Sequence, residues 1–158
     1  MARIGRAFDM QVIAWSENLT PEAAEAAGAR RVTKQRLFAE SDVVSVHLLL
    51  SSRTQGLVGA PDLALMKQDA WLVNTSRGPI VDEQALLVAC RSETIAGAAL
   101  DVYEEEPLPA DHPLRRLPNV ILTPHIGYVT RECLEHWYTD AVESVAAWAA
   151  GAPIRLLT

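Results

Sequence analysis

Short apolar runs alternate with segments of helical periodicity along the sequence, and this alternation restricts the fold more than any other feature. The predicted strands are residues 10–15, 29–32, 42–48, 70–75, 95–102 and 119–124, and the predicted helices are residues 20–28, 33–41, 60–68, 81–91 and 130–150. Strands that are joined by helices form parallel sheets through right-handed crossovers. The sequence therefore predicts an α/β fold with a doubly wound parallel sheet.

Local signals support the helix boundaries. Thr20 is a typical N-cap, Pro21 fits the first helical position, and Gly28 is a typical stop. Gly151 and Pro153 close the last helix in the same way. These signals predict where helices begin and end independently of the apolar pattern.

Composition narrows the functional class. The 158 residues contain 49% hydrophobic and 22% charged residues, which is typical of one soluble globular domain. The 14 basic and 20 acidic residues give a net charge of -6 without a basic stripe, and this argues against a nucleic-acid partner. The apolar runs are too short to span a bilayer, and residues 1–10 do not resemble a signal peptide. We therefore expect a cytoplasmic protein with no membrane contact.

Cysteine spacing gives no metal pattern. Cys90 and Cys133 are far apart, and neither belongs to a CxxC pair. Cys133 and His136 have a ligand-like spacing, but no second well-spaced pair accompanies them. The sequence predicts no metal site, and we interpret both thiols as buried or inert.

Polar residues follow three of the predicted strands. Arg77 follows the strand at 70–75, the acidic run Glu104 to Glu106 follows the strand at 95–102, and His125 follows the strand at 119–124. In parallel sheets, ligands bind outside the carboxyl ends of the strands. The sequence therefore predicts an arginine, a carboxylate and a histidine at one edge of the sheet.

These three groups suit one kind of substrate. A guanidinium binds a carboxylate through two parallel hydrogen bonds and keeps its proton. An imidazole gives or takes a proton near neutral pH, and a carboxylate beside it favours its charged form. Together they suit an acid that carries a carbonyl or a hydroxyl next to its carboxylate. Taken alone, each has an ordinary structural explanation: an exposed arginine, a solvated acidic turn and a structural histidine.

Three separate stretches carry a family resemblance. "LVNTSRGPIVDEQAL", "GAALDVYEEEPLP" and "NVILTPHIG" resemble, in order, the three signatures of the D-isomer-specific 2-hydroxyacid dehydrogenases, in their nucleotide-binding domain. The resemblance implies a Rossmann-like fold, a homodimer, and hydride transfer between NAD and a small 2-hydroxy or 2-oxo acid, with NADP not excluded. It also implies that Arg77 binds the substrate carboxylate and polarises its carbonyl, that His125 is the acid/base, and that Glu106 keeps His125 protonated for reduction.

The same resemblance implies a set of cofactor-binding positions. It places Asp101 near the nicotinamide carboxamide, Thr75, Ser76 and Gly127 along the same part of the cofactor, and His47 and Thr54 where adenosine and phosphates pass. NAD-preferring members carry an acid where this sequence has Ser16, with Glu17 beside it. Glu17 would repel a 2′-phosphate, which favours NAD over NADP.

The beginning of the sequence departs from the family pattern. A dinucleotide fold opens with a strand, a GxGxxG loop and a helix, whereas "MARIGRAF" resembles only the tail of that helix. The usual strand order places the missing strand centrally, between residues 10–15 and 42–48. We expect residues 1–150 to be a partial dinucleotide-binding domain that lacks the first strand and glycine-rich loop. Residues 151–158 resemble a tail that returns to a substrate domain absent from the chain.

Two classes of function therefore stand. The first is a dehydrogenase of which this chain is an incomplete portion, and the second is a non-catalytic relic or interaction module with the same fold. The presence of Arg77, Glu106 and His125 favours the first, and the missing glycine loop favours the second. A formate dehydrogenase ranks lower because its family carries an amide at the position of Glu106. We interpret Trp137, Tyr138 and Trp148 as core or interface residues rather than as a cofactor site.

Overall fold

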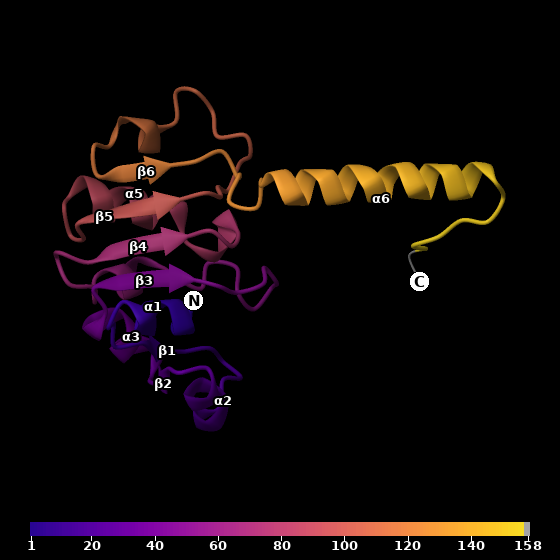
Figure 1. The fold of residues 1–158 in the computed structure, drawn as a ribbon. Helices are drawn as coiled ribbons and strands as arrows, with labels where there is room; N and C mark the ends of the chain where they lie inside the picture. Colours follow the sequence, from indigo (N-terminus) through magenta and orange to yellow (C-terminus); the bar gives the residue numbers. More distant parts are fainter. Residues whose placement is uncertain (157–158) are drawn as a thin grey trace. The chain divides into compact units, whose positions relative to one another are not determined.

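The computed structural model describes residues 1–156, and the chain forms two compact units, Met1–Pro124 and His125–Thr158. The first unit contains all of the β-structure described below. The second contains a loop and one long helix. Figure 1 shows the course of the chain through both units.

A four-stranded parallel sheet forms the centre of the first unit (Figure 1). It consists of β3 (Val43–Val46), β4 (Trp71–Asn74), β5 (Gly97–Leu100) and β6 (Val120–Leu122), hydrogen-bonded in that order. Val44 lies opposite Leu72, Leu72 opposite Ala98, and Ala98 opposite Val120. The predicted parallel α/β fold is therefore confirmed.

A second, two-stranded sheet stands apart from the first. It pairs β1 (Ile13–Ala14) with β2 (Arg30–Arg31) in parallel, and no strand among residues 1–156 joins it to β3. This separation matches the gap that the sequence predicts between residues 10–15 and 42–48. Both strands are shorter than predicted because they pair only with each other, over a register of two residues each.

Five helices belong to the first unit. They are α1 (Ala2–Ala7), α2 (Pro21–Ala26), α3 (Lys34–Glu40), α4 (Ala60–Leu63) and α5 (Glu83–Arg91), and two 3₁₀ turns, η1 (Gly78–Ile80) and η2 (Pro113–Arg116), accompany them. The Thr20 hydroxyl accepts a hydrogen bond from the Ala23 amide at 3.2 Å, and Gly28 has a φ of +80°, so the predicted ends of α2 are confirmed. The predicted helix at 60–68 is wrong beyond Leu63. The amides of Leu65 and Met66 bond to the carbonyls three residues back, which tightens the chain into a turn.

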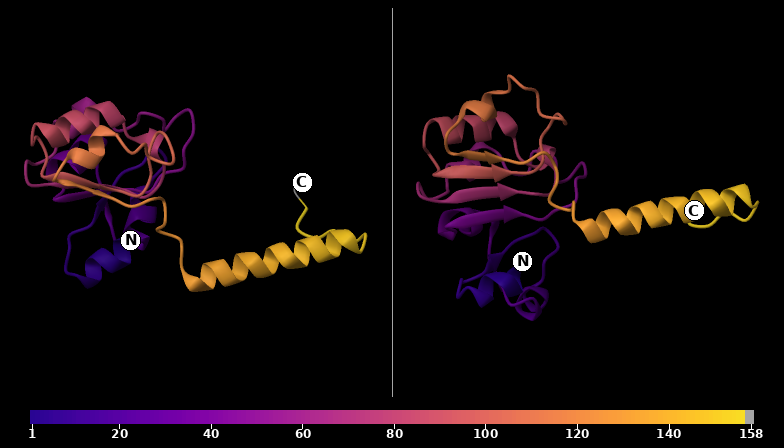
Figure 2. Two further views of the ribbon diagram at one scale, coloured as in Figure 1. Left: turned by 90° about the horizontal axis from the view of Figure 1, so that it is seen from above. Right: turned by 45° about the horizontal axis from the view of Figure 1, so that its top comes forward.

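The core lies on one face of the four-stranded sheet. Phe38 of α3, Leu63 of α4, and Leu86 and Cys90 of α5 form one buried cluster with Leu72 of β4. Figure 2 shows α5 lying along this face of the sheet. Cys90 is buried, as predicted, and burial raises the pKa of its thiol to about 11, so the thiol stays protonated at neutral pH.

The opposite face of the same sheet is more exposed. Val43 of β3 and Ile121 of β6 alternate with core-facing neighbours, and their exposed fractions are 52% and 58%. Val43 lies on the strand at the end of the sheet, whose outer edge pairs with no strand among the described residues. Apolar side chains on an unpaired edge favour association with other chains.

The second unit is dominated by α6 (Arg131–Ala149), which begins at the N-cap Thr130 and ends before Gly151, whose φ is +75°. Arg155 returns to this helix and donates to Asp140 Oδ1 at 2.7 Å and Glu143 Oε2 at 2.8 Å. Residues 157 and 158 of the predicted tail lie outside the described residues. No helix within residues 1–156 is long and apolar enough to cross a bilayer.

The aromatic residues of α6 are not in a core. The exposed fractions of Trp137, Tyr138 and Trp148 are 47%, 72% and 73%, and α6 contains no buried residue. The prediction that these residues belong to a core is therefore wrong for this chain, and the alternative, that they belong to an interface, stays a prediction.

The exposed sheet face generates the first prediction. Residues 1–158 expressed alone should self-associate, and replacing both Val43 and Ile121 by lysine should reduce this association because charge on an edge strand opposes strand addition. Sedimentation velocity measures the effect. Val88→Lys is the matched control, since Val88 is 61% exposed on α5, away from this face. A wild-type chain that sediments as a monomer would contradict the prediction.

Candidate active site

The carboxyl end of β4 leads directly into the turn that carries Arg77. The side chain of Asn74 is buried, and its Nδ2 donates to the Arg77 carbonyl at 3.0 Å while its Oδ1 accepts from the Ser76 amide at 3.0 Å. A buried amide that satisfies both groups in this way fixes the course of the backbone. Asn74 therefore shapes the turn.

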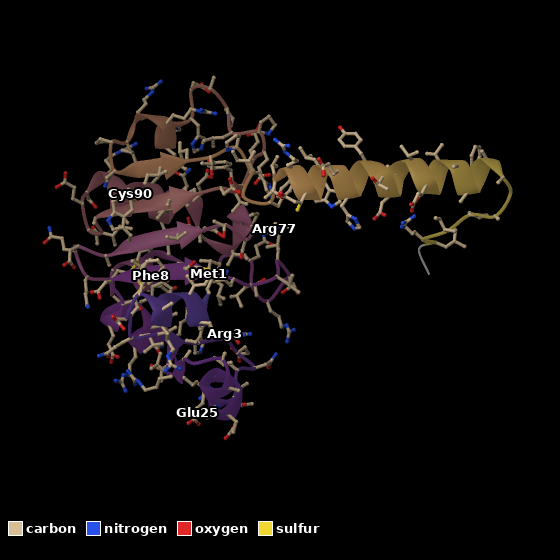
Figure 3. The ribbon with its side chains drawn as sticks, viewed as in Figure 1. Met1, Arg3, Phe8, Glu25, Arg77 and Cys90 are labelled. Carbon is tan, nitrogen blue, oxygen red and sulfur yellow. The ribbon has the colours of Figure 1, made fainter. Side chains whose placement is uncertain are left out.

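Further hydrogen bonds hold the same turn to its neighbour. The Ser76 hydroxyl donates to the Val46 carbonyl at 2.9 Å and links the turn to the end of β3. Arg77 is exposed, its Nη1 donates to the Ser76 carbonyl at 2.6 Å, and Thr75 beside it is exposed as well. Figure 3 shows Arg77 beyond the carboxyl end of β4. The guanidinium is thus presented on the surface at the edge where the sequence places it.

The end of β5 leads into a second turn, which carries Glu106. Asp101 is buried at the start of this segment, and its Oδ1 accepts from the Thr123 hydroxyl at 2.5 Å. Tyr103 is buried as well, and its hydroxyl lies 2.7 Å from the Thr123 carbonyl, to which it donates. Burial and the charge of Asp101 raise the pKa of Tyr103, so the phenol keeps its proton. These contacts fasten the segment to the chain that follows β6.

Glu106 is exposed, and its carboxylate is oriented by its own turn. Its Oε1 accepts from the Tyr103 amide at 2.9 Å. A hydrogen bond from a backbone amide favours the ionised carboxylate and restricts its rotation.

The Arg77 turn and the Glu106 turn are in direct backbone contact. A Cβ placed on Gly78 would lie 2.0 Å from the carbonyl carbon and oxygen of Tyr103. Only glycine allows two backbones to approach so closely. The structure therefore brings together the segments that carry two of the three predicted catalytic residues.

His125 opens the second unit, with Gly127 two residues further on. Its φ is +55°, in the left-handed region, and its ring meets that of Tyr128 edge to face with centroids 5.7 Å apart. The Tyr128 ring in turn lies 5.2 Å from that of Trp137. Because Arg77 and Glu106 belong to the other unit, the meeting of all three side chains stays a prediction.

The remaining predicted cofactor positions lie after β1 and β3 of the first unit, and Thr54 lies in the loop that follows β3. His47 Nε2 lies 2.9 Å from the Ser45 hydroxyl, and burial, followed by the positive amino terminus, lowers the pKa of His47. The Thr54 hydroxyl donates to the Leu49 carbonyl at 2.6 Å and accepts from the Ser51 amide at 2.8 Å. Through these two hydrogen bonds Thr54 shapes its own loop. Ser16 is half-buried and follows β1.

Two hollows of the first unit lie away from these residues. One of about 350 Å³ is lined by Pro21, Glu25 and residues 29–31, and one of about 190 Å³ is lined by Gln68, Glu93, Ile95, Ala96 and Asn119. Neither is lined by a predicted site residue. Residues 1–156 also hold no group of three or more potential metal ligands.

Sequence reasoning missed Asn74 and Tyr103 as site-shaping residues. The signal for Asn74 was a polar residue that ends the otherwise apolar strand at 71–74. The role of Tyr103 depends on Thr123, which is 20 residues away in the sequence, so no local pattern indicates it.

Comparison with known proteins identifies the family. The model of the D-isomer specific 2-hydroxyacid dehydrogenases, NAD binding domain, matches residues 1–127. The chain belongs to this family, and NAD is the cofactor of the matched domain.

Individual relatives agree with this assignment to the family. The chain is 45% identical over 151 residues to a glyoxylate reductase of Aeropyrum pernix, covering 96% of this chain and 45% of that protein. A phosphoglycerate oxidoreductase structure from Vibrio cholerae is 38% identical with a TM-score of 0.88, covering 96% of this chain and 49% of that one. A D-lactate dehydrogenase structure with NAD⁺ from Lactobacillus jensenii is 30% identical with a TM-score of 0.81, covering 99% of this chain and 51% of that one. The chain thus spans about half the length of these relatives.

The close approach at Gly78 generates the second prediction. Gly78→Ala should destabilise the fold by about 1–3 kcal/mol or more, because the new methyl group forces the Arg77 and Glu106 turns apart. Thermal melting should show a decrease of roughly 2–4 °C per kcal/mol. Gly59→Ala is the control, since its Cβ would meet only Pro61 Cδ at 3.7 Å. Equal melting temperatures for the two variants would refute the contact.

Proposed function

We propose that this chain forms the nucleotide-binding half of an enzyme that transfers a hydride between a nicotinamide cofactor and a small 2-hydroxy or 2-oxo acid. The observation that carries the proposal is the backbone contact at Gly78, which juxtaposes the turns of Arg77 and Glu106 at the carboxyl edge of the sheet. Membership in the family supports the reaction class.

Arg77 is proposed to bind the substrate. Its exposed guanidinium can form two parallel hydrogen bonds with the substrate carboxylate, and it polarises the neighbouring carbonyl oxygen. Asn74 and Ser76 hold the turn on which Arg77 stands, so little conformational freedom is lost when the substrate binds.

His125 is proposed to move the proton, with Glu106 as its partner. In the reducing direction the imidazole donates a proton to the carbonyl oxygen, and in the oxidising direction it takes the proton from the hydroxyl. A carboxylate beside it favours the imidazolium form, which the reducing direction requires. The hydrogen bond from the Tyr103 amide orients the Glu106 carboxylate for this role.

The groups at the strand ends fit a dinucleotide in their chemistry. Asp101 supplies a buried carboxylate, and Ser16, His47, Thr75 and Gly127 supply hydroxyl, imidazole and amide groups for ribose and carboxamide. Thr54 and Ser76, whose hydroxyls donate to the Leu49 and Val46 carbonyls, shape the loops beside them. When bound, the nicotinamide accepts or supplies the hydride. Sequence 1–158 contains no GxGxxG loop for the pyrophosphate. We infer that these residues alone bind the cofactor weakly and form an incomplete portion of the enzyme, and that the complete enzyme is a cytoplasmic homodimer.

The third prediction tests the catalytic roles in the complete enzyme proposed above. His125→Ala should lower the turnover number by about 10²–10⁴-fold, because it removes the proton transfer. Arg77→Ala should lower kcat/KM by a similar order, and Arg77→Lys should not restore it, since a point charge cannot reproduce the bidentate contact. Steady-state reduction of glyoxylate, pyruvate and hydroxypyruvate measures these effects.

An exposed arginine outside the proposed site supplies the control. Arg116→Ala, on the η2 turn, should leave the kinetics unchanged. Near-normal kinetics in His125→Ala or Arg77→Ala would refute the assignment.

The fourth prediction concerns cofactor preference. Ser16 and Glu17 follow β1, where a carboxylate at Glu17 repels a 2′-phosphate, so kcat/KM should be higher with NADH than with NADPH. Glu17→Gln should narrow the difference by removing the repulsion, and Glu22→Gln, on α2, is the control. A strong preference of the unmodified protein for NADPH would overturn this prediction.

A further inference from the structure

A half-buried pair of side chains lies behind the Glu106 turn. His112 Nε2 is 3.1 Å from Glu83 Oε1, and the side chains of His112 and Glu83 are only 16% and 14% exposed. The second carboxylate oxygen of Glu83 lies 3.4 Å from the amide of Glu104, from which it accepts. Glu83 thus stands between the acidic turn and the imidazole.

The hydrogen bonds of His112 fix which ring nitrogen carries a proton. Nδ1 accepts a hydrogen bond from the Leu114 amide at 3.4 Å, so Nδ1 carries no hydrogen in this arrangement. Nε2 then carries the ring hydrogen and donates a hydrogen bond to Glu83 Oε1 at 3.1 Å. Each oxygen of the Glu83 carboxylate accordingly receives one donor, from His112 or from Glu104.

The segment that holds His112 is itself fastened. Arg115 Nε donates to the Pro109 carbonyl at 2.8 Å, and Arg115 Nη2 donates to the Leu108 carbonyl at 2.8 Å. His112 therefore stands on a closed loop. Glu83 stands on the first turn of α5, whose inner face is buried. Both partners of the pair therefore stand on anchored segments, whereas Glu104 to Glu106 are exposed.

We propose that Glu83 and His112 are positioning residues, which hold the Glu104 amide and thereby set the place of the Glu106 carboxylate two residues further on. This inference rests on the proposed function of Glu106 as the partner of His125. A rival explanation makes Glu83 a first-turn acid that stabilises α5 through the helix dipole. That explanation requires neither the Glu104 amide nor His112.

A conservative substitution distinguishes the two explanations. Glu83→Gln can accept from the Glu104 amide through its oxygen, but its NH₂ group then faces the proton on His112 Nε2. Glu83→Gln therefore keeps the hydrogen bond to the Glu104 amide and loses the one to His112. We expect its kcat to lie between those of the unmodified protein and Glu83→Ala.

The fifth prediction is a double-mutant cycle in the complete enzyme proposed above. Glu83→Ala and His112→Ala should each lower kcat by about tenfold, the size expected for a lost hydrogen bond to a charged group, with little change in KM. In a Glu106→Gln background the same substitutions should lower kcat no further, because they act through Glu106. Glu105→Ala, an exposed neighbour in the same turn, is the control and should leave kcat unchanged.

Hydrogen exchange followed by mass spectrometry tests the positioning without relying on activity. In Glu83→Ala and His112→Ala, peptides that span residues 103–106 should exchange about 5–10-fold faster, while the core strand β4 keeps its protection. Unchanged exchange at 103–106, or kcat effects that add to that of Glu106→Gln, would overturn the inference. If Glu106→Gln alone leaves kcat unchanged, the proposed function fails, and the exchange result still decides the role of the pair.

Discussion

Parallel pairing from β3 to β6 is the constraint on which the rest of the structure depends. Because the four strands run in the same direction and in register, β4 and β5 deliver their following turns to one edge of the sheet. The edge of an antiparallel sheet would have received only every second turn. At this edge Asn74 fixes one turn and Tyr103 the other, and Gly78 lets the two backbones meet. The polar chemistry of the site therefore follows from the direction of apolar strands.

Much of this fold is predictable because its signals are local. Alternation of apolar runs with helical segments specifies a parallel sheet, and residues such as Thr20 and Gly28 specify the ends of a helix. Strand length is less predictable. An apolar run such as 10–15 forms a ladder only where a neighbour is paired with it, and β1 has a partner for two residues. Likewise, the apolar pattern of α6 does not reveal that its aromatic residues are exposed within this chain.

The candidate site also contains residues with local sequence signals and residues whose roles depend on distant partners. Arg77, Glu106 and His125 can be predicted from the sequence because each follows a strand within a recognisable motif. The groups that hold them are not, since their partners are distant in sequence: 20 residues separate Tyr103 from Thr123, and 29 separate Glu83 from His112. His112 and Glu83 carry ordinary local explanations, a turn residue and a first-turn acid. Only the course of the chain shows that the two side chains meet.

The left-handed backbone at His125 has an evolutionary consequence. A side chain at a φ of +55° raises the free energy of the folded state by roughly 1–2 kcal/mol, and glycine there would relieve it. Local strain of this kind persists where a surrounding structure or a function requires the residue. Selection for thermostability alone would favour glycine at position 125, whereas the proton-transfer role that we propose for His125 opposes it. Under this proposal stability and chemistry compete at a single codon, and a lineage freed from the chemical requirement should lose this histidine early.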